Sequence, residues 1–169
     1  MNTTTNTTLT VFYNDEYVNP NDAETRTKAE PLARMIEQGE VSGVVLKSPR
    51  SVTREQLLQI HDARYLDEQW GKDPQFLASI LASTGGVLAA LDQAMIDGAS
   101  GTLSSGLHHA QRGADNGLCY LNGLALVVHV AIEKYALTDV AFLTPMHTGV
   151  AALFNSLVAI QRFESVMSL

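Results

Sequence analysis

Cysteine is scarce in this 169-residue chain, which contains only Cys119. A single thiol cannot form an internal disulfide, and this favours a reducing, cytoplasmic setting. Positive charge is scarce as well, with 11 Lys and Arg against 18 Asp and Glu and a net charge of -7. The sequence therefore offers no basic surface for a nucleic-acid backbone or an anionic membrane, and we expect neither among its partners.

Long apolar runs are also missing, because no stretch reaches the about 18 consecutive apolar residues that indicate a membrane span. Residues 1–8 are rich in Thr and Asn and lack the basic and apolar pattern of a signal peptide, so we expect a flexible N-terminus. What the chain does have is 46% hydrophobic residues, enough for one sizeable core. The expected organisation is a single domain over residues 9–143, followed by a tail over residues 144–169.

Short apolar strands alternate with helical patterns along the chain. We predict strands over residues 9–13, 41–46 and 139–143, and helices over residues 51–59, 75–95 and 121–135, with a shorter helix between Pro31 and Gly39. In the helix over 51–59, Thr53 and Gln56 have the spacing of a capping box. This alternation predicts an α/β domain of three αβα layers with a mostly parallel sheet, in which residues 139–143 form a buried parallel strand.

Two glycines, Gly85 and Gly86, interrupt the apolar pattern of the helix over 75–95. No strand and phosphate-loop pattern surrounds them, so they are not expected to bind phosphate. We expect them to allow another part of the backbone to approach this helix closely.

Side chains capable of catalysis gather in one region, where two histidines are adjacent. The region comprises Ser104-Ser105-Gly106-Leu107-His108-His109-Ala110 and Gly117-Leu118-Cys119-Tyr120-Leu121-Asn122. Adjacent imidazoles can present two bases, or one base and one imidazolium, to a single bond. The structural alternative is a pair of partly buried polar residues without catalytic function. In a parallel α/β domain we expect this loop at the carboxyl ends of the strands.

These motifs, together with Thr84-Gly85-Gly86, Asp97-Gly98 and His61-Asp62-Ala63-Arg64-Tyr65-Leu66, resemble the zinc-dependent histone deacetylase and acetylpolyamine amidohydrolase family over residues 9–143. The resemblance implies an arginase/deacetylase type of α/β fold. It implies that His108 is a general base and that His109 assists it as base or acid. It also places Gly106, Gly117 and Leu118 at the acyl-binding channel, with Leu118 where the family usually has Phe.

The resemblance ends at Thr144. The family strand leads into an Asp-x-Asp-x-His segment, with two metal ligands and the carboxylate that orients the first tandem histidine. Here Leu143 is followed by Thr144-Pro145-Met146-His147, and the family's third ligand and its transition-state Tyr have no counterpart. We therefore expect that the zinc site is lost and that there is no metal cofactor, with His147 as a candidate remnant.

The genetic code suggests an origin for this departure. If translation shifts frame from the third base of the Leu143 codon, codons allowed for residues 143–155 can encode Asp-x-Asp-Ala-His-Trp-Gly-Gly-Gly-Thr-Phe-Gln. We therefore hypothesise that residues 144–169 are a frameshifted tail on a truncated hydrolase. The DNA sequence tests this hypothesis.

The tail carries apolar residues at spacings of three and four, which predicts a helix over residues 149–168. The residues concerned are Val150, Leu153, Phe154, Leu157, Ile160, Phe163 and Met167. Truncation after Leu143 would uncover an apolar sheet edge, so we expect the tail helix or a second copy of the chain to cover it. The sequence thus predicts a homo-oligomer.

Three functions follow as hypotheses. The first is a deacetylase-like hydrolase with weak, metal-independent activity on a small acylated amide or ester, in which His108 or His109 is the general base. The second is a catalytically inactive remnant that only binds or assembles. The third is a serine esterase with Ser104 or Ser105 as nucleophile and His108 or His109 as its base, although no Gly-x-Ser-x-Gly elbow surrounds these serines.

The remaining candidate groups are interpreted as structural. We expect His61 to belong to a satisfied hydrogen-bond network and His129 to be a packed core or edge residue. Cys119 could be a nucleophile, but free cysteines are usually buried and inert, so we expect it to pack behind the channel.

Overall fold

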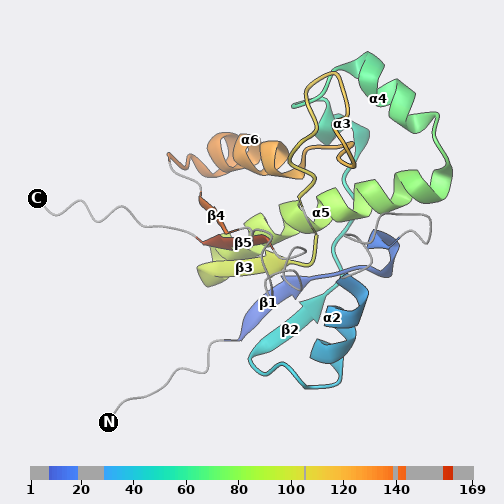
Figure 1. Cartoon of the computed structure of the whole chain (residues 1–169). Helices are drawn as coiled ribbons and strands as arrows, with labels where there is room; N and C mark the ends of the chain where they lie inside the picture. The colour runs from blue at the N-terminus through green and yellow to red at the C-terminus, as the bar shows by residue number, and fades with distance from the viewer. Residues whose placement is uncertain (1–7, 19–28, 105, 139–140, 144–157, 162–169) are drawn as a thin grey trace, which may run out of the picture.

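The computed structural model describes residues 8–18, 29–104, 106–138, 141–143 and 158–161 (Figure 1). Its elements in chain order are β1 (Leu9–Phe12), the 3-10 helix η1 (Asp15–Tyr17), α2 (Ala29–Glu37), β2 (Val44–Lys47), α3 (Arg54–Leu57), α4 (Ala63–Trp70), α5 (Pro74–Asp97), β3 (Ala99–Thr102), α6 (Gly123–Tyr135), β4 (Ala141–Leu143) and β5 (Val158–Gln161).

The strands form one sheet in the order β2-β1-β3-β5-β4. β1 is parallel to both of its neighbours, and its Val11 is paired with Leu46 of β2 and with Gly101 of β3. β5 is antiparallel to β3 on one side and to β4 on the other. The predicted α/β class with a mostly parallel sheet is confirmed.

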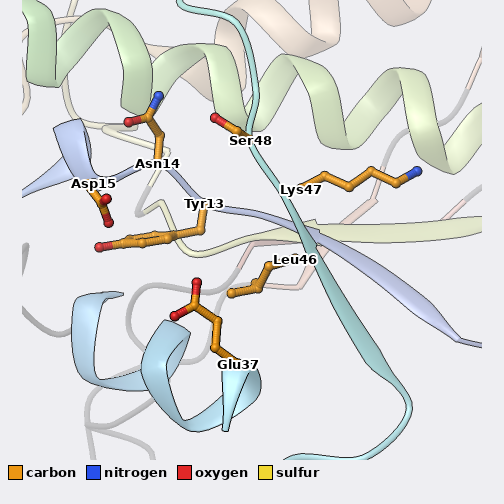
Figure 2. Close-up of a pocket in the computed structure, with 7 residues that line it drawn as sticks. All are labelled: Tyr13, Asn14, Asp15, Glu37, Leu46, Lys47 and Ser48. Carbon is orange, nitrogen blue, oxygen red and sulfur yellow. The ribbon is translucent and has the colours of Figure 1, made fainter. Parts of the chain in front are cut away.

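Helices cover the sheet on both faces (Figure 1). Along β1 the side chains alternate, so that Val11 and Tyr13 pack in a cluster with residues of α2, while Phe12 packs in a cluster with residues of α5 and α6. Figure 2 shows Tyr13 just past the end of β1, close to the side chain of Glu37 on α2. The predicted three layers are therefore present, although α6 packs mainly on α5 rather than between the sheet and its neighbours.

The long helix α5 is defined by clear signals at both ends. The side chain of Asp73 accepts hydrogen bonds from the backbone N–H groups of Gln75 and Phe76, and Pro74 occupies the first turn. Gly98 ends the helix in the left-handed conformation, with φ of 86°. By length and composition alone α5 could cross a membrane, but half of its most apolar window is buried inside this fold, as in a core helix.

The two glycines in the middle of α5 lie where other segments come close, as predicted. A Cβ atom on Gly85 would lie 2.0 Å from the carbonyl oxygen of Arg50, and one on Gly86 would lie 1.7 Å from the hydroxyl of Tyr17. The absence of a side chain therefore lets α5 lie directly against the segment after β2 and against η1.

The capping box at α3 is also present. The Thr53 hydroxyl accepts from the backbone N–H of Gln56, and the Gln56 side chain accepts from the backbone N–H of Thr53. The helix ends at Leu57, earlier than predicted.

β3 and α4 are among the elements that the sequence does not predict. β3 has the sequence Ala-Ser-Gly-Thr, which lacks the apolar and aromatic residues that indicate a strand. Its polar side chains are buried and bonded, since the hydroxyls of Ser100 and Thr102 donate to the backbone carbonyls of Thr10 and Phe12 on β1. α4 (Ala63–Trp70) begins inside the segment 61–66, whose residues carry the family resemblance and not a clear helical signal.

The tail prediction was wrong where the structure describes the tail. Residues Val158–Gln161 form the strand β5 rather than part of a helix over 149–168, and β4 has an antiparallel neighbour rather than a parallel one. The alternating Val158 and Ile160 also fit a strand pattern, and pairing satisfies backbone groups at the edge of β3. The rest of the tail lies outside the described residues.

Candidate active site

The tandem histidines lie on the loop that connects β3 to α6. β3 ends at Thr102, and the next residue, Leu103, donates its backbone N–H to the carbonyl of Phe12 at the end of β1. Because β1, β2 and β3 are parallel, the loop leaves the sheet at the edge where all three strands have their carboxyl ends. This is the predicted position, and it is where α/β folds commonly bind ligands.

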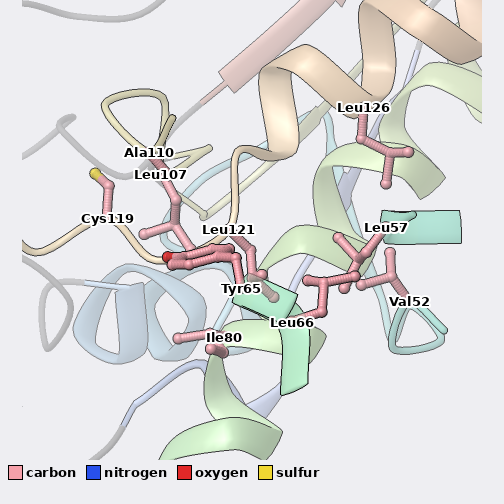
Figure 3. Packing of buried hydrophobic residues seen from close by; sticks show 10 residues of the cluster. All are labelled: Val52, Leu57, Tyr65, Leu66, Ile80, Leu107, Ala110, Cys119, Leu121 and Leu126. Carbon is pink, nitrogen blue, oxygen red and sulfur yellow. The ribbon is translucent and has the colours of Figure 1, made fainter. Parts of the chain in front are cut away.

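The chain turns sharply just before the histidines. Gly106 has φ of 73° and Leu107 has φ of 51°, so two consecutive residues are in the left-handed region. For Leu107 this conformation costs roughly 1 kcal/mol, and burial of its side chain holds it there. Figure 3 shows Leu107 and Ala110 in one apolar cluster with Tyr65 and Leu121. The residues on either side of the tandem pair are thus anchored in the core.

The two imidazoles themselves face solvent. His108 and His109 are both exposed, although Leu107 and Ala110 beside them are buried. Their ring centroids are 4.0 Å apart, and the ring planes are tilted by 43°. The arrangement therefore presents two neighbouring bases to any molecule that reaches this edge.

Asn122, at the end of the same loop, contacts the backbone of the histidine segment. Its side-chain N–H₂ group donates to the carbonyl of His108 at 3.1 Å and to that of Ala110 at 2.8 Å. Its Oδ1 accepts from the backbone N–H of Ala125, which caps α6. Sequence reasoning assigned no role to Asn122, although an Asn directly before an apolar helical pattern is a signal for an N-cap.

His61 is structural, as predicted. Its side chain is almost fully buried, its Nδ1 lies 3.1 Å from the carbonyl of Arg112, and its Nε2 lies 3.1 Å from the backbone nitrogen of Asn122. Since a carbonyl only accepts and a backbone N–H only donates, the ring is neutral, with its proton on Nδ1. Arg112 also donates through Nε to Asp62 at 2.8 Å, which ties the far end of the loop to the start of α4.

The buried imidazole predicts a pH dependence of stability. Burial lowers the pKa of His61 below its ordinary value of 6.5, so the folded state resists taking up the proton. As the pH falls through 6.5 the unfolded chain takes up this proton more readily than the folded chain, so the free energy of unfolding falls as the pH decreases. We expect urea titrations from about pH 7.5 to about pH 5.5 to show a flatter decline in His61→Gln than in the wild type.

A matched control for this pH dependence is His129→Gln, because His129 is a partly buried histidine on α6 that lines a pocket with residues of α3 and α5. This variant should keep the wild-type slope. The same slope in His61→Gln and in the wild type would show that His61 does not limit stability in acid.

Gly117 and Leu118 lie in a tight turn. Asn116 and Cys119 exchange two backbone hydrogen bonds of 3.1 Å, and Gly117 has φ of 61°, as in a two-residue type II′ hairpin turn. The turn leaves the Leu118 side chain 49% exposed, while Cys119 is buried. Cys119 belongs to the same cluster as Leu107 and Ala110, so the turn and the histidine loop share one support (Figure 3).

The candidate serine nucleophile Ser104 is buried and hydrogen-bonded within the fold. It is buried, its hydroxyl is 2.6 Å from that of Ser83 on α5, and it accepts from the backbone N–H of Gly106. A nucleophile must reach its substrate, and this hydroxyl is committed to holding the loop against α5. Ser105 lies outside the described residues.

The zinc ion of the resembled family does not fit the residues that the structure describes. Within those residues there is no group of three or more His, Cys, Asp or Glu side chains close enough to hold a metal. A catalytic zinc site normally needs three protein ligands. His147, the candidate remnant, lies outside the described part of the chain.

A hollow with a volume of about 260 Å³ lies at the carboxyl ends of β1 and β2 (Figure 2). Its lining residues are Tyr13, Asn14, Asp15, Glu37, Leu46, Lys47 and Ser48. Burial, followed by the charge of Asp15, raises the pKa of the Tyr13 phenol, which therefore stays protonated at neutral pH. Because the hydroxyl oxygen is closed to solvent, it is not available to a ligand in the hollow.

Comparison with known proteins identifies a family whose domain matches most of the chain. The histone deacetylase domain matches residues 22–149, a range that contains His61, the tandem histidines and the turn at Gly117. A search of curated proteins found no match. The matched range starts later than the predicted range of 9–143 and continues past Leu143 to residue 149.

Proposed function

Because the chain belongs to the histone deacetylase family, with its arginase-like α/β fold, we propose that it hydrolyses small acylated amides or esters, with His108 or His109 as general base and without a metal ion. The observation that supports this most is the exposed pair of imidazoles on a loop whose neighbouring residues are buried. Exposure gives the bases access to water and substrate, while the buried neighbours keep them in place.

The proposed reaction needs only a water molecule and the two imidazoles. His108 takes a proton from water while the water oxygen attacks the acyl carbon. The bond to the leaving amine or alcohol then breaks, and the leaving group receives that proton from the imidazolium of His108 or by way of His109. Such general acid and base help contributes about a hundredfold or more in rate. Weak activity, higher on an activated ester than on an amide, is therefore expected.

Metal dependence tests this proposal. Hydrolysis of a short-chain aryl ester and of an acetyl-lysine amide should be measured before and after the protein is washed with a chelator. Since the described residues do not provide three zinc ligands, we expect ester hydrolysis to be unchanged by the wash and the protein to contain no stoichiometric zinc. Stoichiometric zinc, or activity that disappears with the chelator and returns with zinc, would overturn the metal-free mechanism.

The alternative is a protein that binds or assembles without catalysis. It is favoured by the same lack of a three-ligand group among the described residues. It predicts no hydrolysis above the buffer rate with either substrate. A homo-oligomeric state and a cytoplasmic location remain predictions from the sequence.

A further inference from the structure

The side chain of Asn122 bonds to the backbone of the histidine loop on both sides of His109. We propose that Asn122 is a positioning residue, which fixes the main chain on both sides of His109 and so keeps both imidazoles in place for hydrolysis. This inference rests on the proposed function for its effect on rate. The fixing of the loop is a separate claim that can be tested without any substrate.

The two donors of the Asn122 amide are both used on the loop. They bond to the carbonyls of His108 and Ala110, the residues directly before and after His109. An amide N–H₂ group has two donors and no spare one, so this site is saturated. The backbone cannot rotate about His109 without breaking at least one of these bonds.

We call the two hydrogen bonds from the Asn122 amide to His108 and Ala110 the clamp. The other polar groups of Asn122 connect this clamp to the core. Oδ1 accepts from the backbone N–H of Ala125 in the first turn of α6, and the backbone N–H of Asn122 donates to the buried ring of His61. These partners also settle the orientation of the amide, because Oδ1 faces a donor and the nitrogen faces two acceptors. One residue therefore joins the histidine loop, the start of α6 and the His61 network.

The loop needs such an anchor. Its histidine side chains are exposed and bury little surface of their own, and the chain reaches them through the left-handed Gly106 and Leu107. General base catalysis depends on placement, because a displacement of about 1 Å can lower a rate by about a hundredfold. A loop freed at the carbonyls of His108 and Ala110 should keep both bases and lose part of the rate.

Two substitutions separate the clamp from the helix cap. Asn122→Ser and Asn122→Asp both keep a side-chain oxygen that can cap α6, since Ser, Asp and Asn are about equally good at this position. Neither can donate to the two loop carbonyls: serine is too short, and the aspartate carboxylate is only an acceptor. The two variants differ in charge, so an effect common to both reports the lost clamp.

The experiment measures hydrogen exchange of residues 106–111, the kcat and KM for the aryl ester, and the thermal midpoint. The control is Thr53→Ala, which removes the cap of α3 and leaves the histidine loop alone. We expect faster loop exchange and about a tenfold lower kcat, with little change in KM, in both Asn122 variants. Thr53→Ala should lower the thermal midpoint and keep kcat.

The outcomes are distinct. Unchanged loop exchange in both Asn122 variants would overturn the clamp, whether or not the wild type hydrolyses the ester. Faster exchange with wild-type kcat would overturn the positioning role. If the wild type shows no hydrolysis while exchange still increases, the clamp is supported and the proposed function fails.

Discussion

Replacing His108 with alanine is expected to lower the rate of aryl-ester hydrolysis about a hundredfold, close to the rate in buffer. In the proposed reaction this imidazole accepts the proton of the attacking water. The ring centroids of His108 and His109 are 4.0 Å apart, so His109 can compensate in part. We therefore expect the loss to be greatest when both histidines are replaced.

His129→Ala is the control for these variants, because it removes an imidazole from α6 and leaves the loop intact. It should keep the wild-type rate. Ser105→Ala should keep it as well if an imidazole is the base and water is the nucleophile. Activity lost in Ser105→Ala and kept in both single histidine variants would instead support a serine esterase.

The fold class follows from the sequence because it depends on local patterns. Alternation of short apolar segments with helical spacings indicates α/β layers, and the box at Thr53 and Gln56 needs only four residues to be recognised. The predicted close approach at Gly85 and Gly86 is confirmed for a related reason. Two adjacent glycines inside an apolar helix usually mark a place where another segment comes close to the helix backbone.

The failures concern interactions between distant residues. β3 is a strand because β1 and β5 bond to its backbone and because its hydroxyls bond to β1, none of which its own composition indicates. The apolar spacing of the tail fits a helix, yet Val158–Gln161 pairs with β3 and β4. A side-chain pattern cannot identify a partner strand more than 50 residues away in the chain.

The candidate site divides in the same way. The tandem histidines can be recognised from the sequence as candidate bases, and the family resemblance indicates the same residues. The role of Asn122 was not visible, because its partners are the backbone carbonyls of the loop and the ring of His61, which is 61 residues earlier. The buried state of Ser104 likewise depends on Ser83 in α5. Reactive groups can be found from the sequence, whereas the groups that hold them require the structure.

Replacing Gly85 with alanine is expected to destabilise the fold by about 2 kcal/mol or more. The added methyl would lie 2.0 Å from the carbonyl oxygen of Arg50 and 3.0 Å from its carbonyl carbon. Both are backbone atoms, so neither can rotate away as the end of a long side chain would. The clash outweighs the gain of about 1 kcal/mol that alanine brings to a helix interior.

The matched control is Gly71→Ala, because Gly71 has φ of -81° and its nearest atom to an added Cβ is 3.5 Å away, an ordinary contact. Urea unfolding should give a free energy within about 0.5 kcal/mol of the wild type for this control. In Gly85→Ala, α5 must move away from Arg50, and it carries Ser83, whose hydroxyl holds Ser104 at the base of the histidine loop. We therefore expect esterase activity to fall along with stability. Equal unfolding midpoints for Gly85→Ala and Gly71→Ala would show that the segment after β2 can yield at no cost.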